Sequence, residues 1–353
     1  MKTHYLDSGI GRMVQIEGKD YLYFSGTSYL GIGQDRDFLD LLANNLFEFG
    51  ASHGQSRINN TRLRVFDEFE DAFAESAGAE SAAVFSSGYL AGIAAWKSLV
   101  GNTDEVWIAP DAHPAIIPDG LVPMIKFNFT QWKKHCLERA EELSSRRILI
   151  IGNALDSLSG QIHDYSWVKD LGQKHRISQL LDDSHAFGTV GNSIYGTYQQ
   201  WNSPDVNLLV SGSLGKGLGL PAGIVLGSLA EIGRIKTTPL FGGASPGSPA
   251  HLCTFLQMED RYLEKKSWLE DACGIFAQEV ERIKQINGSR HFPVFRYTEN
   301  AWLREFEKAG IITSSFPYPT PGSPTVNRIV ISGFHELGDL MYLLDIIHNL
   351  KRG

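Results

Sequence analysis

The sequence predicts an α/β fold in which a mostly parallel central sheet is flanked by helices, with a smaller α+β domain at the C-terminal end. Two observations predict it. Short apolar runs alternate with stretches of helical periodicity, a pattern typical of a parallel sheet covered by helices. The 353 residues are also enough for one large domain and a second, smaller one.

The N-terminal elements are expected to be a hairpin followed by two helices. The apolar runs Met13–Ile16 and Tyr21–Phe24 lie on either side of the polar turn 17–20, which is typical of a β-hairpin. Residues 38–49 and 65–77 show helical periodicity.

Six apolar runs are expected to form the central sheet, with a helix over 90–99 after the first of them. The runs are 82–85, 106–108, 148–151, 179–181, 208–210 and 223–226. In sheets of this kind, ligands bind beyond the carboxyl ends of the strands. We therefore expect polar residues that follow these runs to form a binding site.

On this pattern the chain divides into three segments. Residues 1–37 form the hairpin segment, and 38–254 form the large α/β domain. Residues 255–353 form the small α+β domain, which ends in a helix expected over 338–350.

Composition excludes several classes of function. A net charge of −8 argues against general nucleic-acid binding, which requires a basic face. No apolar run reaches the ~20 residues of a membrane span, and the first residues lack the apolar core of a signal peptide. Cys136, Cys253 and Cys273 have no metal or redox spacing. Sparse cysteines suit a reducing compartment, so we expect a cytoplasmic protein without a metal site.

Lys216 lies in the glycine-rich stretch 211–219, directly after the apolar run 208–210. Glycines let the backbone pass close to a bound group and adopt positive φ. A partly desolvated lysine in such a turn can lose its proton and attack an aldehyde to form a Schiff base. The alternative is a phosphate-binding loop, G-x-x-x-x-G-K-[ST]. That motif would need serine or threonine where this chain has Gly217.

Asp182 and His185 follow the apolar run 179–181, at the expected end of a buried strand. A carboxylate in this place can pair with a pyridine nitrogen and keep it protonated. The protonated ring is the electron sink of pyridoxal 5'-phosphate (PLP) chemistry. A helix N-cap or a solvated turn is the structural alternative for the Asp182–Asp183 pair. Together with Lys216, these residues favour a PLP site.

Five segments, in this order, resemble the α-oxoamine synthase family of PLP-dependent enzymes, which have the fold type I architecture. The segments are Phe24–Gly31, Phe85–Tyr89, Asp182–His185, the Lys216 stretch and Arg328–His335. The similarity extends from about residue 21 to about residue 350. The family includes 8-amino-7-oxononanoate synthase and 2-amino-3-ketobutyrate CoA ligase.

This resemblance implies a role for each cofactor residue. Lys216 would hold PLP as a Schiff base, Asp182 would pair with the ring nitrogen, and His185 would bond the ring hydroxyl. His113 would stack on the ring. A helix N-terminus can hold a dianion, so the phosphate is expected at the start of the helix over 90–99. The phosphate contacts would come from Ser87, Gly88, Tyr89 and Ser213. The cofactor site would also include Asn153, in place of the family's acidic residue, and Ser157.

Arg328 aligns with the second arginine of the family's Arg-x-Arg strand, which binds the carboxylate of the amino acid substrate. The planar guanidinium fits this task because it pairs bidentately. The first arginine is replaced by Val326. A strand-edge ion pair is the structural alternative for Arg328. Thr27 is expected on the substrate side as well.

The resemblance also implies the reaction and the assembly. A small amino acid would condense with an acyl thioester, such as an acyl-CoA, to give an α-aminoketone with loss of CO2. The enzyme would be a homodimer with its active site at the interface, and the loop 50–60 would contribute to that interface.

Several departures from the family pattern fall around the substrate rather than the cofactor. Thr27-Ser28 replaces an Asn-Asp pair, Phe66 a histidine, and Gly92 an asparagine. Gly242-Gly243 replaces a serine–threonine pair, with Ser245 as a substitute. The substrates are therefore left open, while PLP binding is expected to be retained.

Two other functions stay open at this point. One is amino transfer or Cα–Cβ cleavage on the same fold, which Asn153 favours because aminotransferases often have an asparagine near the ring hydroxyl. The other is a PLP-binding module without turnover. The presence of Asp182, His185 and Lys216 together argues against the second, since a protein without turnover would be free to lose the lysine.

Overall fold

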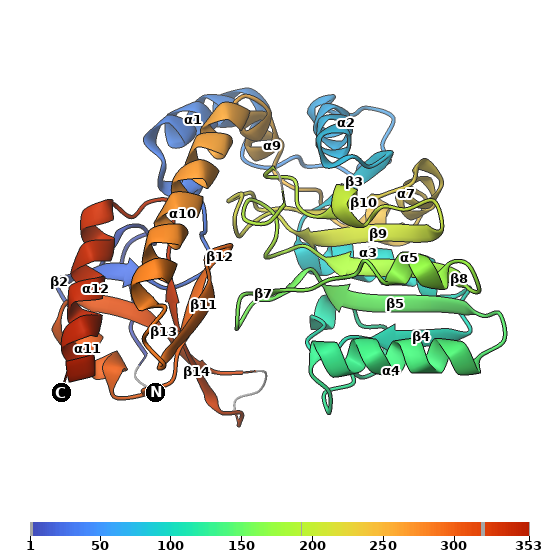
Figure 1. The fold of residues 1–353 in the computed structure, drawn as a ribbon. Coiled ribbons are helices and arrows are strands. Elements are labelled where there is room, and N and C mark those ends of the chain that lie inside the picture. The colour runs from blue at the N-terminus through green and yellow to red at the C-terminus, as the bar shows by residue number, and fades with distance from the viewer. Residues whose placement is uncertain (1–2, 192, 319–321, 353) are drawn as a thin grey trace.

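A computed structural model describes residues 3–191, 193–318 and 322–352, which form two domains side by side (Figure 1). The central sheet of the larger domain has six strands. Their order is β3 (Ser81–Phe85), β10 (Gly223–Gly227), β9 (Val206–Ser213), β8 (Arg176–Asp182), β5 (Arg147–Asn153) and β4 (Glu105–Ile108). β10 is antiparallel to both of its neighbours, and the remaining pairs are parallel. All six expected strands are present.

Helices cover both faces of this sheet because its strands are apolar on both sides. Ile148 and Ile150 of β5 belong to one core cluster, whereas Leu149 and Ile151 belong to another, as alternation along a strand requires. The first cluster includes residues of α2 (Val65–Ala77), α4 (Phe129–Glu142) and α5 (Val168–Leu171). The second includes residues of α3 (Gly88–Val100), α7 (Leu229–Lys236) and α8 (Pro239–Gly243).

The second domain contains another six-stranded sheet, which combines strands from the N-terminal and the C-terminal parts of the chain. Its order is β1 (Met13–Ile16), β2 (Lys19–Phe24), β13 (Ile311–Pro317), β14 (Thr325–Val330), β12 (Phe292–Tyr297) and β11 (Ile286–Ser289). Its helices are α10 (Glu259–Val280), α11 (Trp302–Lys308) and α12 (Leu337–Arg352). The expected hairpin is present, but β2 pairs in parallel with β13, so the hairpin is part of this sheet rather than a unit of its own.

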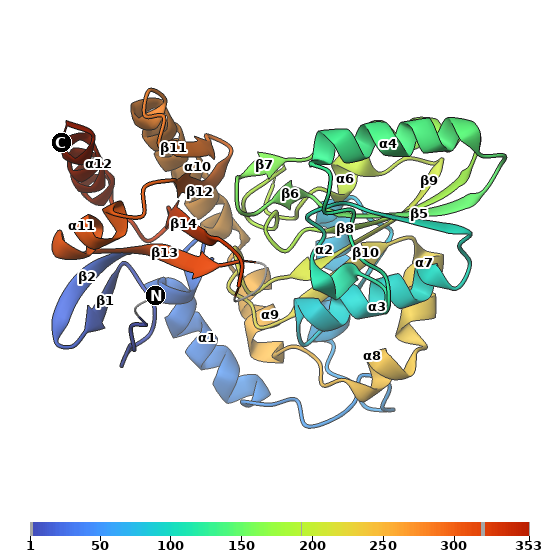
Figure 2. The ribbon, with the colours of Figure 1, turned by 90° about the horizontal axis from the view of Figure 1, so that it is seen from below.

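Two helices connect the domains. α1 (Arg36–Phe49) packs against α9 (Pro249–Leu256), and α9 also contacts α2 of the larger domain (Figure 2). The remaining short elements are η1 (Ile32–Gln34), η2 (Pro114–Ile116), β6 (Leu155–Asp156), β7 (Gln161–Ile162) and α6 (Tyr198–Trp201). In the described part of the chain, no helix is both long enough and apolar enough to cross a membrane. The segment boundaries at 37 and 254 stay a prediction.

Candidate active site

The predicted cofactor residues gather at the carboxyl ends of three neighbouring parallel strands. Asn153, the last residue of β5, lies opposite Asp182 at the end of β8, and Asp182 lies opposite Ser211 of β9. The loops after β8 and β9 carry His185 and Lys216. These two loops meet, because a Cβ on Gly188 would lie 3.3 Å from the backbone carbon of Gly217. The sheet therefore brings together residues from three separate parts of the sequence.

Lys216 lies in a turn that only glycine permits. A Cβ on Gly217 would lie 2.2 Å from the carbonyl oxygen of Phe187, and Gly219 has a φ of +66°. Burial lowers the pKa of the Lys216 ammonium, the carboxylate of Asp182 opposes that shift, and Arg328 adds to it. The lowered pKa favours the unprotonated amine, which is the form that attacks an aldehyde.

The two adjacent aspartates have different environments. Asp182 is buried, accepts a hydrogen bond from the Ser184 backbone at 2.8 Å, and is electrostatically coupled to Lys216. Asp183 is directed elsewhere: its carboxylate accepts the backbone N–H of Thr197 at 2.6 Å and the Thr197 hydroxyl at 2.9 Å. Burial raises the pKa of Asp183 to about 7. Asp182 is therefore the aspartate whose carboxylate can contact a ligand in the site. The carboxylate of Asp183 instead holds Thr197 in place.

His185 is held by Tyr29, whose hydroxyl lies 2.7 Å from Nδ1 of the imidazole. Burial lowers the pKa of His185 well below its usual value, with further contributions from Lys216 and Arg328, so the ring is neutral. Tyr29 was not predicted as a site residue. It lies within the Phe24–Gly31 segment, and its position in that segment was the available signal.

His113 is the N-cap residue of η2, and its Nδ1 accepts the backbone N–H of Ala115 at 3.2 Å. Burial lowers the pKa of His113, Asp182 raises it and Lys216 lowers it. The imidazole is thus neutral, with its proton on Nε2. Its backbone N–H donates to Oδ1 of Asn153 at 3.0 Å, and Nδ2 of Asn153 donates to the carbonyl of Asp111 at 2.5 Å. Both ends of the Asn153 amide therefore hold the loop that carries His113, and its predicted contact with the cofactor stays a prediction.

A second contact that sequence reasoning missed fixes the same loop. Nε2 of the buried His163 lies 2.7 Å from a carboxylate oxygen of Asp111, and its ring stacks on Phe129 with centroids 3.8 Å apart. Asp111 precedes His113 by two residues, so this pair sets the path of the backbone that presents the imidazole. The two partners are 52 positions apart in the sequence, so no local pattern could indicate their contact.

The start of α3 is pressed against the end of β9, as a phosphate cradle requires. A Cβ on Gly88 would lie 2.5 Å from the backbone nitrogen of Ser213. Ser87 is the N-cap and accepts the backbone N–H of Leu90 at 3.2 Å. Oγ of Ser213 accepts the backbone N–H of Gly215 at 3.2 Å. Tyr89 is 54% exposed at the same helix end. Backbone N–H groups and a hydroxyl are therefore available for a dianion.

The guanidinium of Arg328 in β14 is buried and has few hydrogen-bond partners. One Nη atom donates to the carbonyl of Ser157 at 3.2 Å, and the group lies over the Phe316 ring at 4.9 Å. Nε is buried without a hydrogen-bond partner among the described residues. Burial lowers the pKa of Arg328. Since a buried charge is costly unless it is paired, this position suits an anionic ligand. Ser157 contributes its carbonyl to Arg328, and its predicted contact with the cofactor stays a prediction.

Packing accounts for three of the departures from the family pattern. A Cβ on Gly92 would lie 2.7 Å from the carbonyl of Ala115, so glycine lets α3 approach the turn after His113. A Cβ on Gly242 would lie 2.9 Å from Ile58 of the loop 50–60. Phe66 packs edge-on against the imidazole of His53. Thr27, two residues before Tyr29, accepts the Tyr29 backbone N–H through its carbonyl at 2.9 Å.

The residues at this site fit PLP. Lys216 supplies an amine with a lowered pKa, and Asp182 supplies a buried carboxylate. At the start of α3, a Cβ on Gly88 would fill the space in which the phosphate is expected, so glycine keeps that space open. The imidazoles of His113 and His185 are both neutral, and they lie near each other in the site. The fold and the site together define a PLP-dependent enzyme of the α/β class.

Comparison with known proteins shows the family. Residues 30–270 match the model of the aminotransferase class I and II family, and the chain belongs to that family. It is 27% identical to a putative 8-amino-7-oxononanoate synthase of Trichodesmium erythraeum, over 98% of this chain and 93% of that protein. It is 26% identical to the 8-amino-7-oxononanoate synthase of Fervidobacterium nodosum, over 96% and 91%.

A solved structure of the serine palmitoyltransferase of S. paucimobilis has a similar fold. The TM-score is 0.83 at 17% identity, covering 99% of this chain and 92% of that one. These findings confirm the predicted fold class, the resemblance to α-oxoamine synthases, and the prediction of a PLP-dependent transferase.

Proposed function

We propose that this protein is an acyltransferase of the α-oxoamine synthase type. It condenses a small amino acid with an acyl thioester, such as an acyl-CoA, to an α-aminoketone with loss of CO2. One observation carries the proposal: the guanidinium of Arg328 is buried, its Nε has no hydrogen-bond partner among the described residues, and it lies near the Lys216 amine. The relatives named 8-amino-7-oxononanoate synthase support the acyl-transfer reaction.

The cofactor residues keep the roles that the resemblance implies. Ser87, Gly88, Tyr89 and Ser213 would hold the phosphate. Asp182 would keep the ring nitrogen protonated, His185 would bond the ring hydroxyl, and His113 would cover the ring face. When bound, PLP withdraws electrons from the α-carbon of the amino acid.

Lys216 and Arg328 act on the substrate. Arg328 pairs with the amino acid carboxylate, which can accept from the buried Nε that has no hydrogen-bond partner among the described residues. The neutral amine of Lys216 takes the α-proton as general base. A C–C bond then forms between the α-carbon and the thioester carbonyl carbon. The C–S bond breaks and the thiol leaves with a proton. Loss of the carboxylate as CO2 leaves the bonding electron pair on the α-carbon. That carbon takes back the proton that Lys216 removed, which gives the α-aminoketone, and the proton of the departing thiol comes from water.

Amino transfer or Cα–Cβ cleavage is the second candidate, since the family model covers aminotransferases. Asn153 favoured it at the level of the sequence. In the fold, the Asn153 amide is bonded to Asp111 and to the backbone of His113, so that support is weaker. A PLP-binding module without turnover is a third reading, and the retained Lys216 argues against it. We also propose that the enzyme is a cytoplasmic homodimer with the loop 50–60 at its interface.

The experiment compares the wild type with Lys216→Ala, and uses the exposed Lys97→Ala as a control. Visible absorbance of bound PLP is recorded before and after glycine, L-alanine or L-serine, and thiol release and α-aminoketone formation are measured with acyl-CoA. We expect one amino acid to change the spectrum and to support turnover. Lys216→Ala should lose turnover by a factor on the order of 10³ or more. Amino transfer to a keto acid without ketone formation, or PLP binding without any turnover, would overturn the proposal.

A further inference from the structure

Tyr29 reaches the candidate active site from the second domain. Its backbone carbonyl accepts the N–H of Gly333 at 2.7 Å, and its ring packs against that of Phe292 of β12, with centroids 5.4 Å apart. The side chain is fully buried. Its hydroxyl crosses to the larger domain, where it lies 2.7 Å from Nδ1 of His185. This hydrogen bond therefore joins the two domains at one of the predicted cofactor residues.

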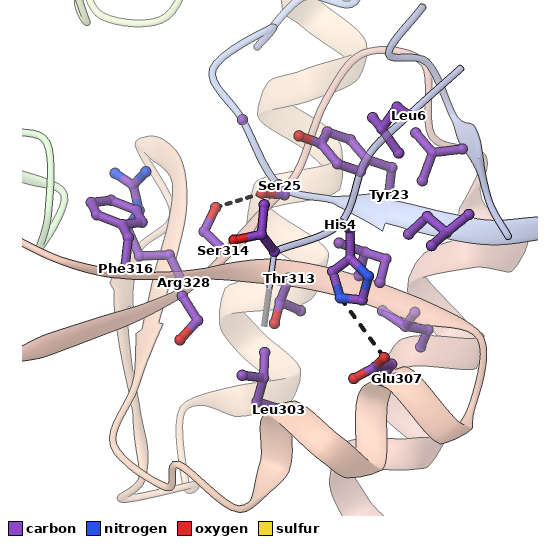
Figure 3. A pocket seen from close by; sticks show the side chains of 17 residues that line it. His4, Leu6, Tyr23, Ser25, Leu303, Glu307, Thr313, Ser314, Phe316 and Arg328 are labelled. Carbon is purple, nitrogen blue, oxygen red and sulfur yellow. Dashed lines mark hydrogen bonds and ion pairs between the residues drawn. The ribbon is translucent and has the colours of Figure 1, made fainter. Parts of the chain in front are cut away.

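The chain is also fixed just before Tyr29. The hydroxyl of Ser25 lies 2.7 Å from that of Ser314 (Figure 3), and Ser314 is opposite Arg328 in the β13–β14 pair. Both serines and Arg328 line a cavity of about 420 Å³. Because the backbone is held before Tyr29 by Ser25 and at Tyr29 itself by its own carbonyl, the hydroxyl has little freedom to move away from His185.

The donor in this hydrogen bond is the Tyr29 hydroxyl. Burial raises its pKa, so the phenol keeps its proton at neutral pH. If Nδ1 of His185 carried the imidazole proton instead, the hydrogen of the buried Tyr29 hydroxyl would have no acceptor among the described residues. A buried donor without a partner is costly. The packing around Tyr29 therefore requires Nδ1 to be the acceptor.

The imidazole of His185 is neutral, because burial lowers its pKa and the cations Lys216 and Arg328 lower it further. A neutral imidazole has one N–H, and the hydrogen bond made by one nitrogen decides whether the other is protonated. Since Nδ1 accepts from Tyr29, the proton lies on Nε2. Nε2 bonds no described residue, so its N–H can donate to a ligand. Beside two cations, the favoured acceptor is an atom with negative charge.

We propose that Tyr29 is a positioning residue: it fixes the proton of His185 on Nε2, so that this histidine donates a hydrogen bond to the ring oxygen of PLP. The inference rests on the proposed function, in which His185 bonds that oxygen. With its proton on Nδ1, the imidazole would present a lone pair to the oxygen instead. Because Tyr29 is held by the second domain, the docking of the two domains sets the hydrogen-bonding state of a cofactor residue in the larger one.

The first measurement is nitrogen NMR of isotope-labelled histidine in the protein without PLP. His185→Gln identifies the His185 signals by their loss. In the wild type, we expect Nδ1 to be unprotonated and to accept a hydrogen bond, and Nε2 to carry the proton. Tyr29→Phe keeps the ring that packs against Phe292 and removes the hydroxyl, so the His185 signals should shift.

The second measurement is PLP affinity by absorbance titration. We expect Tyr29→Phe to bind PLP about tenfold more weakly than the wild type, because the donor to the ring oxygen is no longer fixed. Tyr297→Phe is the matched control. It removes another buried hydroxyl, which bonds Thr313 at 2.8 Å, and it should change neither the His185 signals nor the affinity.

Three results would overturn the inference: a wild-type His185 with its proton on Nδ1, unchanged His185 signals in Tyr29→Phe, or unchanged PLP affinity in that variant. The wild-type spectrum needs no variant, so it decides the position of the proton even where Tyr29→Phe fails to fold. Failure of the proposed function gives a different pattern. The expected spectra and affinities without any α-aminoketone formation would reject the acyl transfer and retain the role of Tyr29.

Discussion

Burial changes the protonation of individual residues in opposite directions within this site. It lowers the pKa of Lys216 and of His185, so both are favoured as neutral bases. It raises the pKa of Asp183, because the charged carboxylate is the form that burial disfavours. Adjacent residues therefore have different tasks: Asp182 is coupled to the lysine, whereas Asp183 holds Thr197.

Asp183 should make stability depend on pH. Its pKa is about 7 in the folded protein against 3.8 in an unfolded chain. Between these values the unfolded chain has already lost a proton that the folded protein keeps, so this group lowers stability as pH rises from about 4 to 7. Above pH 7 its effect is constant. Each unit of the pKa shift corresponds to about 1.4 kcal/mol.

We expect Asp183→Asn to remove the fall in stability between about pH 4 and pH 7. The amide does not titrate, and its oxygen can still accept a hydrogen bond from the Thr197 backbone. The free energy of unfolding is measured with urea from pH 4 to pH 8, with the exposed Asp119→Asn as a control. The stability of Asp183→Asn relative to wild type should rise through this window. Parallel curves for the two proteins would contradict the assignment.

At the scale of elements, the site depends on how closely α3 approaches two neighbours. Gly88 permits contact with the backbone of Ser213, and Gly92 permits contact with the carbonyl of Ala115. From the other side, a Cβ on Gly223 of β10 would lie 2.2 Å from the carbonyl oxygen of Ser87. The N–H groups of α3 thus reach the ends of the strands because three positions lack a side chain.

We expect Gly88→Ala to weaken PLP binding at least tenfold and to lower stability by about 1–3 kcal/mol, because α3 must move away from Ser213. PLP affinity is measured by absorbance titration, and stability by thermal unfolding. Gly101→Ala, at the other end of the same helix, is the matched control, because a Cβ there meets nothing within 4 Å. Unchanged PLP affinity in Gly88→Ala would show that the close approach has no role in the site.

For the whole molecule, the exposed apolar residues bear on assembly. Phe47 near the end of α1 is 93% exposed, and Ile58 in the loop 50–60 is 61% exposed. Where exposed apolar side chains form a contiguous patch, that patch is typical of a surface that another protein covers. The proposed homodimer would cover them with a second copy of the chain.

We expect sedimentation equilibrium to give the mass of two chains for the wild type. Phe47→Glu should shift the protein toward a single chain if the proposed interface covers Phe47, because the substitution would place a charge there. Leu229→Glu, at an exposed position of α7, is the control and should remain dimeric. A single-chain mass for the wild type at micromolar concentration would contradict the dimer.

Local patterns were sufficient to predict much of the fold. The six expected runs of the central sheet coincide with six strands, and the expected hairpin and the helices over 38–49 and 65–77 are present. Periodicity could not predict the pairing of β2 with β13, because the strands lie almost 290 residues apart. That pairing sets the place of Ser25 next to Ser314, and it creates the cavity beside Arg328.

The sequence by itself determined the class of chemistry, because a lysine in a glycine-rich turn and a carboxylate after a buried strand are local features. Only the tertiary structure decided which aspartate remains for the site, that Tyr29 holds His185, and that Asp111 and His163 support the loop of His113. It also decided that Arg328 is buried and that its Nε has no hydrogen-bond partner among the described residues. Protonation and pairing depend on what surrounds a group in three dimensions, and those neighbours come from distant parts of the chain.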